Sequence, residues 1–323
     1  MKAFVLTDDG ARIREVAAPR PGPAEVLVAV RACALNRADL GMARGRLHGR
    51  AGGAGSVLGM EWAGEVAEVG ADVSAYRPGD RVMGSGAGAF AEQAVADVGR
   101  VLPIPAAGMT FEEAACLPVA LQTMHDAIVT NGQMVPGQSV LVHGASSGVG
   151  LMAMQIAKVR GAALVVGSST NAERRSRLAS FGADLAVDPN RQGWVEEVLA
   201  ATEGGGVDLV IDQVSGAGFN ETMKATRIKG RIVNVGRLGG ERGEFDFDLH
   251  ALRRINYVGV TFRTRSKQEV REITERMLAD LAAPLAEGKL GLPVDATFPL
   301  DELPQALERM RANEHFGKIV VSV

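Results

Sequence analysis

The chain has 323 residues, more than one compact hydrophobic core usually accommodates, so two domains are expected. Apolar residues make up 46% of it and the formal net charge is −3, which fits a globular protein and argues against a nucleic-acid partner. The N-terminal stretch reaches Asp8 before an apolar signal sequence could form, and no run of 18 apolar residues predicts a membrane span. Two cysteines, Cys33 and Cys116, indicate a reducing compartment, so the predicted location is the cytoplasm.

The first part of the chain, to about residue 118, has the pattern of short strands separated by turns. Apolar residues alternate around Val26, Val28 and Val30, which is typical of a strand with one buried face. The Gly-rich segment 45–56 is predicted to be a mobile loop. Strands are predicted at 25–35, 64–70 and 81–86. This part is therefore expected to be an all-β module.

Further along the chain, strands and helices alternate. Thr110 and Glu113 have the spacing of a capping box, as do Ser266 and Glu269, so a helix is expected to begin at each place. Strands are predicted at 139–144, 162–167, 185–188, 207–212, 230–236, 255–266 and 316–323, and helices at 148–160, 171–181, 191–203 and 217–227. The alternation from residue 139 predicts parallel βαβ units with helices on both faces of the sheet.

The turn "ASSGVG" follows the first strand of this alternating region. The positions of a G-x-G-x-x-G fingerprint hold Ala145, Ser147 and Gly150, all small enough to let the backbone approach a pyrophosphate. The helix that starts near Gly148 would direct free N–H groups at that anion. The predicted cofactor-binding residues of the turn are Ala145, Ser146, Ser147, Gly148, Val149 and Gly150. A tight turn without a ligand is the alternative.

The end of the second strand of the unit bears on the choice of dinucleotide. NAD-binding proteins usually place a carboxylate there, on the ribose 2′-hydroxyl. Here the strand ends in Ser168 and Ser169, and Arg174 and Arg175 follow. Hydroxyl and guanidinium groups suit a 2′-phosphate, so NADP(H) is predicted through Ser168, Ser169 and Arg174. The alternative for the arginines is a solvated helix face.

Several segments together resemble a known family. In chain order they are "ACALNRADL", "LGMEWAGEVAEVG", "YRPGDRVMG", "FEEAACLPVALQT", "VLVHGASSGVG", "VDLVIDQVSG" and "HFGKIV". This order is similar to that of the zinc-free medium-chain dehydrogenases/reductases, and most of all to their quinone oxidoreductase (zeta-crystallin-like) branch. The resemblance implies an α/β protein with a GroES-like, β-rich catalytic domain at 1–118, completed by 264–323, and a doubly wound Rossmann domain at 119–263. It also implies an active site in the cleft between these domains.

Zinc is not expected. Zinc-dependent relatives carry a cysteine where this chain has Asn36 and a histidine where it has Met60, and neither replacement is a usual zinc ligand. Without a Lewis acid to stabilise the alkoxide, alcohol oxidation is not favoured. Hydride delivery to an electron-poor acceptor needs no metal.

The resemblance also implies roles for single residues. Asn36 and Asp39 resemble the segment beside the nicotinamide and the substrate, and the Asn36 amide could stabilise a developing enolate. A turn or capping asparagine is the alternative for Asn36. The remaining residues that the resemblance places at the cofactor are Thr123, Val235, Gly236, Arg263 and Lys318. A helix hydroxyl bonded to its own backbone is the alternative for Thr123, and a surface charge is the alternative for Arg263 and Lys318.

The substrate pocket departs from that of several relatives, which have tyrosines after the asparagine motif. Met42, Leu47 and His48 are predicted to border the pocket instead. Tyr76 is expected in a turn and Tyr257 in a strand of the C-terminal return, so no tyrosine is an evident proton donor. The oxygens of a reduced quinone can be protonated from solvent without a dedicated acid, which favours quinone over conjugated carbonyl substrates.

Three functions remain open. The first is an NADPH-dependent, zinc-independent quinone reductase, and the second is an enone or enoyl-thioester reductase. The third is an NADPH-binding sensor or structural protein with little catalysis. A homodimer is expected, because the family commonly joins its Rossmann sheets through the strand near 261–266, which would otherwise be an exposed edge.

Overall fold

The computed structural model describes residues 1–49, 51–105 and 108–323. Over these ranges the chain divides into two compact units. Unit 1 consists of Met1–Gln122 and Phe262–Val323, and unit 2 consists of Thr123–Thr261. Unit 1 is therefore discontinuous in sequence, with unit 2 inserted into it.

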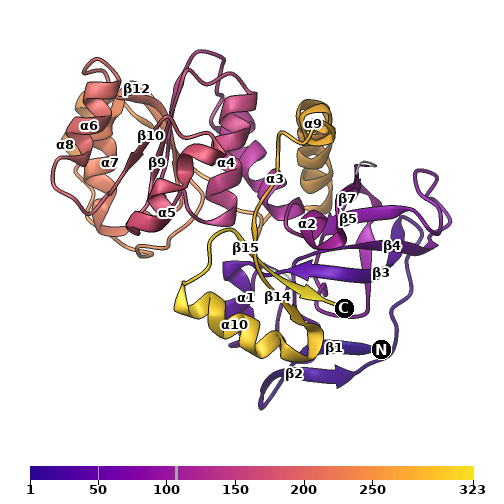
Figure 1. Cartoon of the computed structure of the whole chain (residues 1–323). Helices are drawn as coiled ribbons and strands as arrows, with labels where there is room; N and C mark the ends of the chain where they lie inside the picture. The colour runs from indigo at the N-terminus through magenta and orange to yellow at the C-terminus, as the bar shows by residue number, and fades with distance from the viewer. Residues whose placement is uncertain (50, 106–107) are drawn as a thin grey trace. The chain divides into compact units, whose positions relative to one another are not determined.

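Unit 2 is built on a parallel sheet with the strand order β10-β9-β8-β11-β12-β13. Its strands are β8 (Ser139–Val142), β9 (Leu164–Ser168), β10 (Leu185–Val187), β11 (Val207–Asp212), β12 (Thr226–Asn234) and β13 (Asn256–Gly259). Its helices are α4 (Gly148–Val159), α5 (Ala172–Ser176), α6 (Trp194–Ala201), α7 (Phe219–Ala225) and α8 (Phe247–Arg253). Figure 1 shows α4 on one face of this sheet and α6, α7 and α8 on the other. The predicted parallel βαβ architecture is confirmed.

Two predicted elements of unit 2 differ from the observed ones. The helix expected at 171–181 is split into α5 and a 3-10 helix, Leu178–Phe181, which ends at the left-handed Gly182 (φ 96°). The strand expected at 255–266 stops at Gly259, because its partner β12 ends at Asn234, opposite Gly259. Tyr257 therefore lies in the parallel sheet, and its predicted place in the C-terminal return is wrong.

Unit 1 contains a mostly antiparallel sheet with the order β14-β15-β3-β4-β5-β7, in which β6 also pairs with β3. The strands are β3 (Glu25–Ala34), β4 (Glu61–Val69), β5 (Arg81–Ser85), β6 (Gln93–Asp97), β7 (Val101–Pro103), β14 (Val294–Pro299) and β15 (Lys318–Ser322). A separate hairpin is formed by β1 (Lys2–Thr7) and β2 (Gly10–Glu15). The strand at the end of the chain, β15, pairs with β3, so residues at both ends of the sequence complete one sheet.

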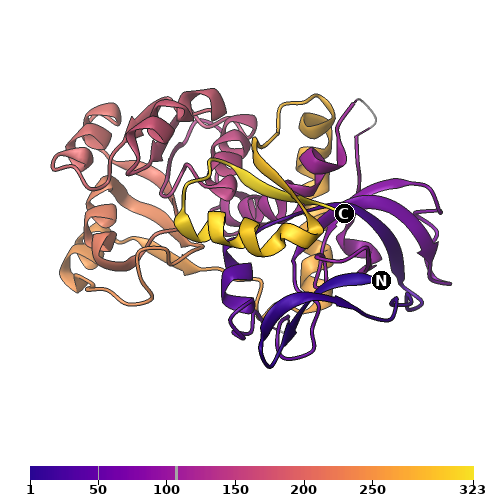
Figure 2. The same cartoon turned by 60° about the horizontal axis from the view of Figure 1, so that its bottom comes forward.

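The helices of unit 1 lie around this sheet. They are α1 (Arg37–Met42), α2 (Phe111–Ala115), α9 (Lys267–Ala286) and α10 (Leu303–Ala312), while α3 (Pro118–His125) contains the boundary to unit 2 and continues into a π-helix, Asp126–Asn131. Figure 2 shows α10 beside β14 and β15. Both predicted capping boxes are present, at Thr110 with Glu113 and at Ser266 with Glu269. Among the described residues, no helix is long and apolar enough to cross a membrane.

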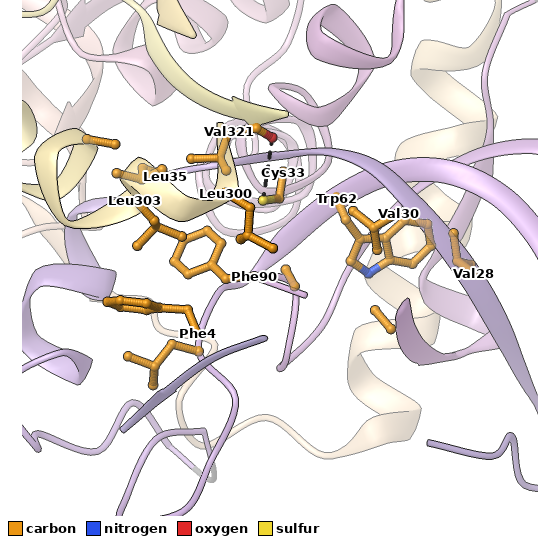
Figure 3. Close-up of a cluster of buried hydrophobic side chains, with 14 of the residues drawn as sticks. Phe4, Val28, Val30, Cys33, Leu35, Trp62, Phe90, Leu300, Leu303 and Val321 are labelled. Carbon is orange, nitrogen blue, oxygen red and sulfur yellow. Dashed lines mark hydrogen bonds between the residues drawn. The ribbon is translucent and has the colours of Figure 1, made fainter. Parts of the chain in front are cut away.

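The core of unit 1 explains the alternation seen in the sequence. Val26, Val28 and Val30 all point inward and are at most 3% exposed. Figure 3 shows Val28 and Val30 beside Trp62, and Phe4 close to Phe90 in the same buried cluster. Burying a side chain of this size stabilises a fold by about 1.5–3 kcal/mol. The position of this core fixes the end of β3, where the candidate catalytic residues begin.

Candidate functional site

The glycine turn of unit 2 is built for a close backbone approach. A Cβ atom on Gly150 would lie 2.5 Å from the carbonyl oxygen of Gly144 and 2.7 Å from the Cα atom of Ala145. The hydroxyl of Ser147 caps α4 by accepting a hydrogen bond from the N–H of Gly150, at 3.1 Å. The helix therefore starts tightly against the end of β8, as the degenerate fingerprint predicts.

The start of α4 provides donors for a phosphate group. Gly148 and Val149 are the first residues of a 12-residue helix, so their N–H groups have no acceptor within it. The positive end of the helix dipole adds to this attraction for an anion. The turn and the helix thus fit the pyrophosphate of a dinucleotide.

Two serines at the end of β9 have different surroundings. The hydroxyl of Ser168 is buried and lies 2.8 Å from Nδ1 of His143, whose Nε2 atom lies 3.0 Å from the hydroxyl of Thr222. Burial lowers the pKa of His143, so its ring is neutral and bridges two hydroxyl groups. The hydroxyl of Ser169 instead lies 3.0 Å from that of Ser146, in the glycine turn. Ser169 is therefore the serine associated with the predicted cofactor turn, while Ser168 supports His143.

The two arginines that follow β9 lie in the short helix α5. The side chain of Asn171 caps this helix by accepting from the backbone N–H of Arg174, at 2.9 Å. The Arg175 guanidinium donates to the carbonyl oxygen of Ser169 at 2.7 Å and forms an ion pair with Asp188 at 3.2 Å. Arg175 is thereby anchored beside Ser169. The sequence prediction used Arg174 and did not identify this anchoring role of its neighbour.

The loop after β12 is organised by Asp212, at the end of β11. Its carboxylate accepts from the backbone N–H groups of Val214 and Ser215 at 2.9 and 2.8 Å. Its backbone oxygen accepts from Val235 and Gly236 at 2.7 and 3.2 Å. The N–H groups of Val235 and Gly236, which the resemblance places at the cofactor, are thus already bonded within the protein.

A buried polar cluster lies in unit 1 where three strand ends meet. Because β4 and β15 both run antiparallel to β3, both strands begin beside the C-terminal end of β3. Asn36 follows β3, Glu61 begins β4 and Lys318 begins β15. Glu61 is fully buried and Lys318 is 5% exposed. The topology therefore brings together residues that are far apart in sequence.

The contacts within this cluster are specific. The Lys318 ammonium donates to the Glu61 carboxylate at 2.5 Å, to the Leu35 carbonyl oxygen at 2.8 Å and to Oδ1 of Asn36 at 3.1 Å. Nδ2 of Asn36 donates to Oε1 of Glu61 at 2.8 Å, and the N–H of Val119 donates to Oε2 of Glu61 at 2.9 Å. All three protons of the ammonium are engaged within the chain, so Lys318 is neither a surface charge nor a free donor for a cofactor.

Asp39 lies next to this cluster, in the first turn of α1. Its Oδ2 atom accepts from the backbone N–H of Asn36 at 2.6 Å, whereas its buried Oδ1 atom has no hydrogen-bond partner among the described residues. Burial is the main reason that the pKa of Asp39 is raised to about 7; the Asn36 N–H and the charge of Lys318 lower it, and the charge of Glu61 raises it. A substantial fraction of Asp39 is therefore protonated at neutral pH.

This raised pKa predicts a pH-dependent stability. Between the unfolded value of 3.8 and about 7, the folded protein holds one proton more than the unfolded chain, so the free energy of unfolding falls as the pH rises. Asp39→Asn removes this titration. The free energy of unfolding of the variant, relative to that of the wild type, is therefore expected to increase by about 1.4 kcal/mol per pH unit in that window. Urea unfolding of both proteins between about pH 5 and 8 measures the difference. A constant difference across that range would contradict the assignment.

The predicted pocket residues have different surroundings. Met42 is 1% exposed and belongs to the core of unit 1, so it does not border a pocket as predicted. Leu47 is 64% exposed. His48 lies near Arg263: burial and the charge of Arg263 lower the pKa of its ring. The predicted loop 45–56 includes Arg50, which lies outside the described residues.

Thr123 was predicted at the cofactor, and Glu61 is a buried residue of the polar cluster. Thr123 lies within α3 and is half-buried. Glu61 was not predicted. Its signal in the sequence is a carboxylate within the otherwise apolar stretch "GMEWAG". Such a charge in a buried strand requires a partner, but the sequence does not say which one.

Comparisons with known proteins agree with this architecture. Residues 22–106 match the family described as the alcohol dehydrogenase GroES-like domain, and residues 148–279 match the family described as zinc-binding dehydrogenase. Quinone oxidoreductase-like protein 2 from Bos taurus is 31% identical over 96% of this chain and 88% of its own length. The native structure of a mycobacterial protein in complex with NADPH matches with a TM-score of 0.87 and 25% identity, and the match covers 100% of both chains.

A much larger protein also matches. A phenolphthiocerol/phthiocerol polyketide synthase from Mycobacterium tuberculosis is 30% identical over 98% of this chain, which spans only 14% of the length of that synthase. The matched domains and the fold together show a GroES-like unit combined with a Rossmann unit, as in the dehydrogenases and oxidoreductases that the chain resembles. The chain belongs to the quinone oxidoreductase family of the medium-chain dehydrogenases/reductases.

Proposed function

We propose that the protein is an NADPH-dependent, zinc-independent reductase that transfers hydride to a quinone. The observation that carries this proposal is the Asn36 amide, which stands where zinc-dependent relatives have a metal ligand and is held between Lys318 and Glu61. An amide held in this way offers a hydrogen-bond donor to a carbonyl oxygen without any metal.

The choice of NADPH is supported by the region after β9. No carboxylate stands at the end of this strand, while Ser169 lies beside the glycine turn and Arg175 is anchored to its carbonyl oxygen. Arg174 lies in the same turn of α5 as Arg175. A 2′-phosphate carries about two negative charges, which hydroxyl and guanidinium groups stabilise.

The reaction then needs little from the protein besides binding and orientation. Bound NADPH supplies the hydride. The Asn36 N–H donates to the carbonyl oxygen on which negative charge develops. Quinone, NADPH and one proton give hydroquinone and NADP⁺, and the proton on the second oxygen can come from solvent. No buried acid is required for this substrate class.

The direct test is NADPH oxidation by the purified protein, followed by absorbance, with ortho- and para-quinones beside enones and crotonyl-thioesters. NADH is assayed in parallel. Rapid turnover of quinones with NADPH is expected. NADPH binding without turnover of any acceptor would instead favour the sensor or structural role and overturn the proposed activity.

Reduction of a conjugated carbonyl is the second candidate, and Asp39 is the observation that favours it. Addition of hydride to such a substrate must be followed by protonation of the α-carbon, which requires an acid. Asp39 is buried, its pKa is about 7 and one of its carboxyl oxygens has no hydrogen-bond partner among the described residues. Stereospecific reduction of enones without quinone turnover would select this candidate.

The cofactor assignment predicts a change in specificity. Arg174→Ala is expected to raise the Kd for NADPH about tenfold and that for NADH less than twofold, because only NADPH carries the 2′-phosphate. Titration of protein fluorescence with each cofactor measures both constants. Arg177→Ala, just beyond the same helix, is the control and should leave both unchanged. Equal weakening of NADPH and NADH by Arg174→Ala would argue against the assignment.

We further propose a homodimer formed through β13, the edge strand of the parallel sheet. The strand is not at 261–266, as the sequence predicted, but at Asn256–Gly259. Large apolar side chains are exposed on it and on the neighbouring α8: Tyr257 is 45% exposed, Leu252 is 68% and Phe247 is 78%. A second copy of the chain could extend the sheet and cover these residues.

This dimer predicts the effect of a proline in β13. The N–H of Val260 donates to Asn234 of the neighbouring strand, so by alternation the N–H of Gly259 points to the open edge. A Cβ atom on Gly259 meets nothing within 4 Å. Gly259→Pro should therefore raise the Kd of the dimer at least about tenfold, whereas Gly259→Ala should leave this Kd unchanged. Sedimentation equilibrium measures this, and a dimer that survives Gly259→Pro would place the interface elsewhere.

A further inference from the structure

We propose that Lys318 and Glu61 are positioning residues that hold the Asn36 amide in one orientation, so that one of its N–H groups is presented to the substrate carbonyl oxygen. This inference rests on the proposed function and adds to it, because neither the carboxylate nor the ammonium touches the substrate. It gives Lys318 a role different from the cofactor contact that the family resemblance implies.

The chemistry of the two charged groups determines which way the amide points. An ammonium can only donate hydrogen bonds, and a carboxylate can only accept them. Oδ1 of Asn36 accepts from Lys318 and Nδ2 donates to Glu61. Rotation of the amide by a half turn would set its N–H groups against the ammonium and its oxygen against the carboxylate. Both contacts would then be repulsive, so one orientation is selected.

Burial makes this selection strong. Glu61 is fully buried and Lys318 is 5% exposed, so water does not compete for their hydrogen bonds. Each charged group is also tied to the backbone, Lys318 through the Leu35 carbonyl oxygen and Glu61 through the Val119 N–H. The two groups that orient the amide are therefore themselves fixed in place.

The pair also prepares the remaining donor. One N–H of the Asn36 amide is bonded to Glu61, and the described residues provide no acceptor for the other. The ammonium at Oδ1 withdraws electron density from the amide, which makes the second N–H a better donor. Such a donor is suited to an oxygen that becomes negative as hydride arrives.

The decisive variant is Glu61→Gln combined with Lys318→Gln. Each new amide can both donate and accept, so hydrogen bonding in the core is retained while the preference for one orientation of Asn36 is lost. The net charge is unchanged. The matched control is Arg31→Gln with Glu65→Gln, which removes an exposed ion pair of 2.7 Å in the same sheet. Lys318→Arg keeps a donor-only cation and tests for rescue.

The kinetic measurement separates a positioning role from a structural one. In the Glu61→Gln/Lys318→Gln variant, kcat for quinone reduction is expected to fall about 100-fold, while the Kd for NADPH changes less than twofold. The control pair should keep the wild-type kcat, and Lys318→Arg should stay within about fivefold of it. A wild-type kcat in the glutamine variant, or a parallel loss of kcat and NADPH affinity, would overturn the proposal.

A second measurement does not depend on the substrate. With ¹⁵N-labelled asparagine, the Asn36 side chain should give two separate, slowly exchanging N–H signals, assigned by their loss in Asn36→Ser. In the glutamine variant these signals should exchange with solvent faster and broaden, because the amide then samples more than one orientation about its Cβ–Cγ bond. Signals that are equally sharp and slow in both proteins would refute the positioning role. If the wild type reduces no quinone, the proposed function fails, but this measurement still decides whether the pair holds the amide.

Discussion

Gly150→Ala is expected to raise the Kd for NADPH by at least about 100-fold, or about 2.7 kcal/mol. The added Cβ atom would lie 2.5 Å from the Gly144 carbonyl oxygen and 2.7 Å from the Ala145 Cα atom, and neither backbone atom can move without opening the turn. The start of α4 must therefore shift away from the end of β8. The N–H groups of Gly148 and Val149 would shift with it and no longer converge on the pyrophosphate.

The control for this prediction is Gly218→Ala, in the same unit. A Cβ atom on Gly218 meets nothing within 4 Å, and the residue has an ordinary negative φ of −82°. Fluorescence titration with NADPH and circular dichroism should be measured on both variants. Wild-type affinity in Gly150→Ala would show that the turn does not contact the cofactor. Loss of affinity in Gly218→Ala as well would mean that the effect is not specific to the turn.

Asn36→Ala is expected to lower kcat for quinone reduction by about 100- to 1,000-fold, the usual effect of removing one donor to a developing oxyanion. The Kd for NADPH should remain within about twofold, because the proposed contacts of the phosphates lie in unit 2. The truncation also removes a partner from both Lys318 and Glu61 in a buried cluster. A loss of stability of about 1–3 kcal/mol is therefore expected in the same variant.

Stopped-flow measurement of a single turnover distinguishes these effects, since it reports the hydride step on the folded, NADPH-bound fraction. Asn36→Asp is the informative companion variant, because it retains the size of the side chain but replaces the N–H donor with an acceptor. It should be as slow as Asn36→Ala. Full activity in either variant would exclude Asn36 as the donor to the carbonyl oxygen.

The sequence predicted those parts of the fold that depend on local patterns. Alternating apolar residues located β3, and the glycine turn between an apolar strand and a helix located the first βαβ unit. The spacing of Ser266 and Glu269 located the start of α9. In each case the signal lies within a few residues of the element that it predicts, so tertiary context had little to override.

The buried polar cluster shows why the rest could not be predicted. Lys318 and Glu61 are 257 positions apart, and their contact exists only because β15 and β4 both flank β3. Lys318 alone has the appearance of a charge near the cofactor, and Glu61 alone has that of an anomaly in a strand. Only the order of the strands shows that each satisfies the other.

Met42 and the two serines at the end of β9, Ser168 and Ser169, illustrate a second limit. A methionine beside a catalytic motif can face a pocket or the core, and the turn of α1 that carries Met42 directs it into the core. Ser168 and Ser169 are adjacent and chemically identical, but alternate residues of a strand point to opposite sides. Ser168 meets His143 while Ser169 meets Ser146, a distinction that residue type does not reveal.

The pairing of β15 with β3 has a consequence for how the protein is made. During synthesis, residues 32–34 leave the ribosome long before residues 320–322, with which they pair in the folded sheet. Unit 2 is continuous and can fold during synthesis, whereas unit 1 must wait for the last strand to emerge. Until then Glu61 lacks its ammonium partner, and the edge of β3 is open to other chains. We therefore expect nascent unit 1 to be more prone to aggregation than nascent unit 2.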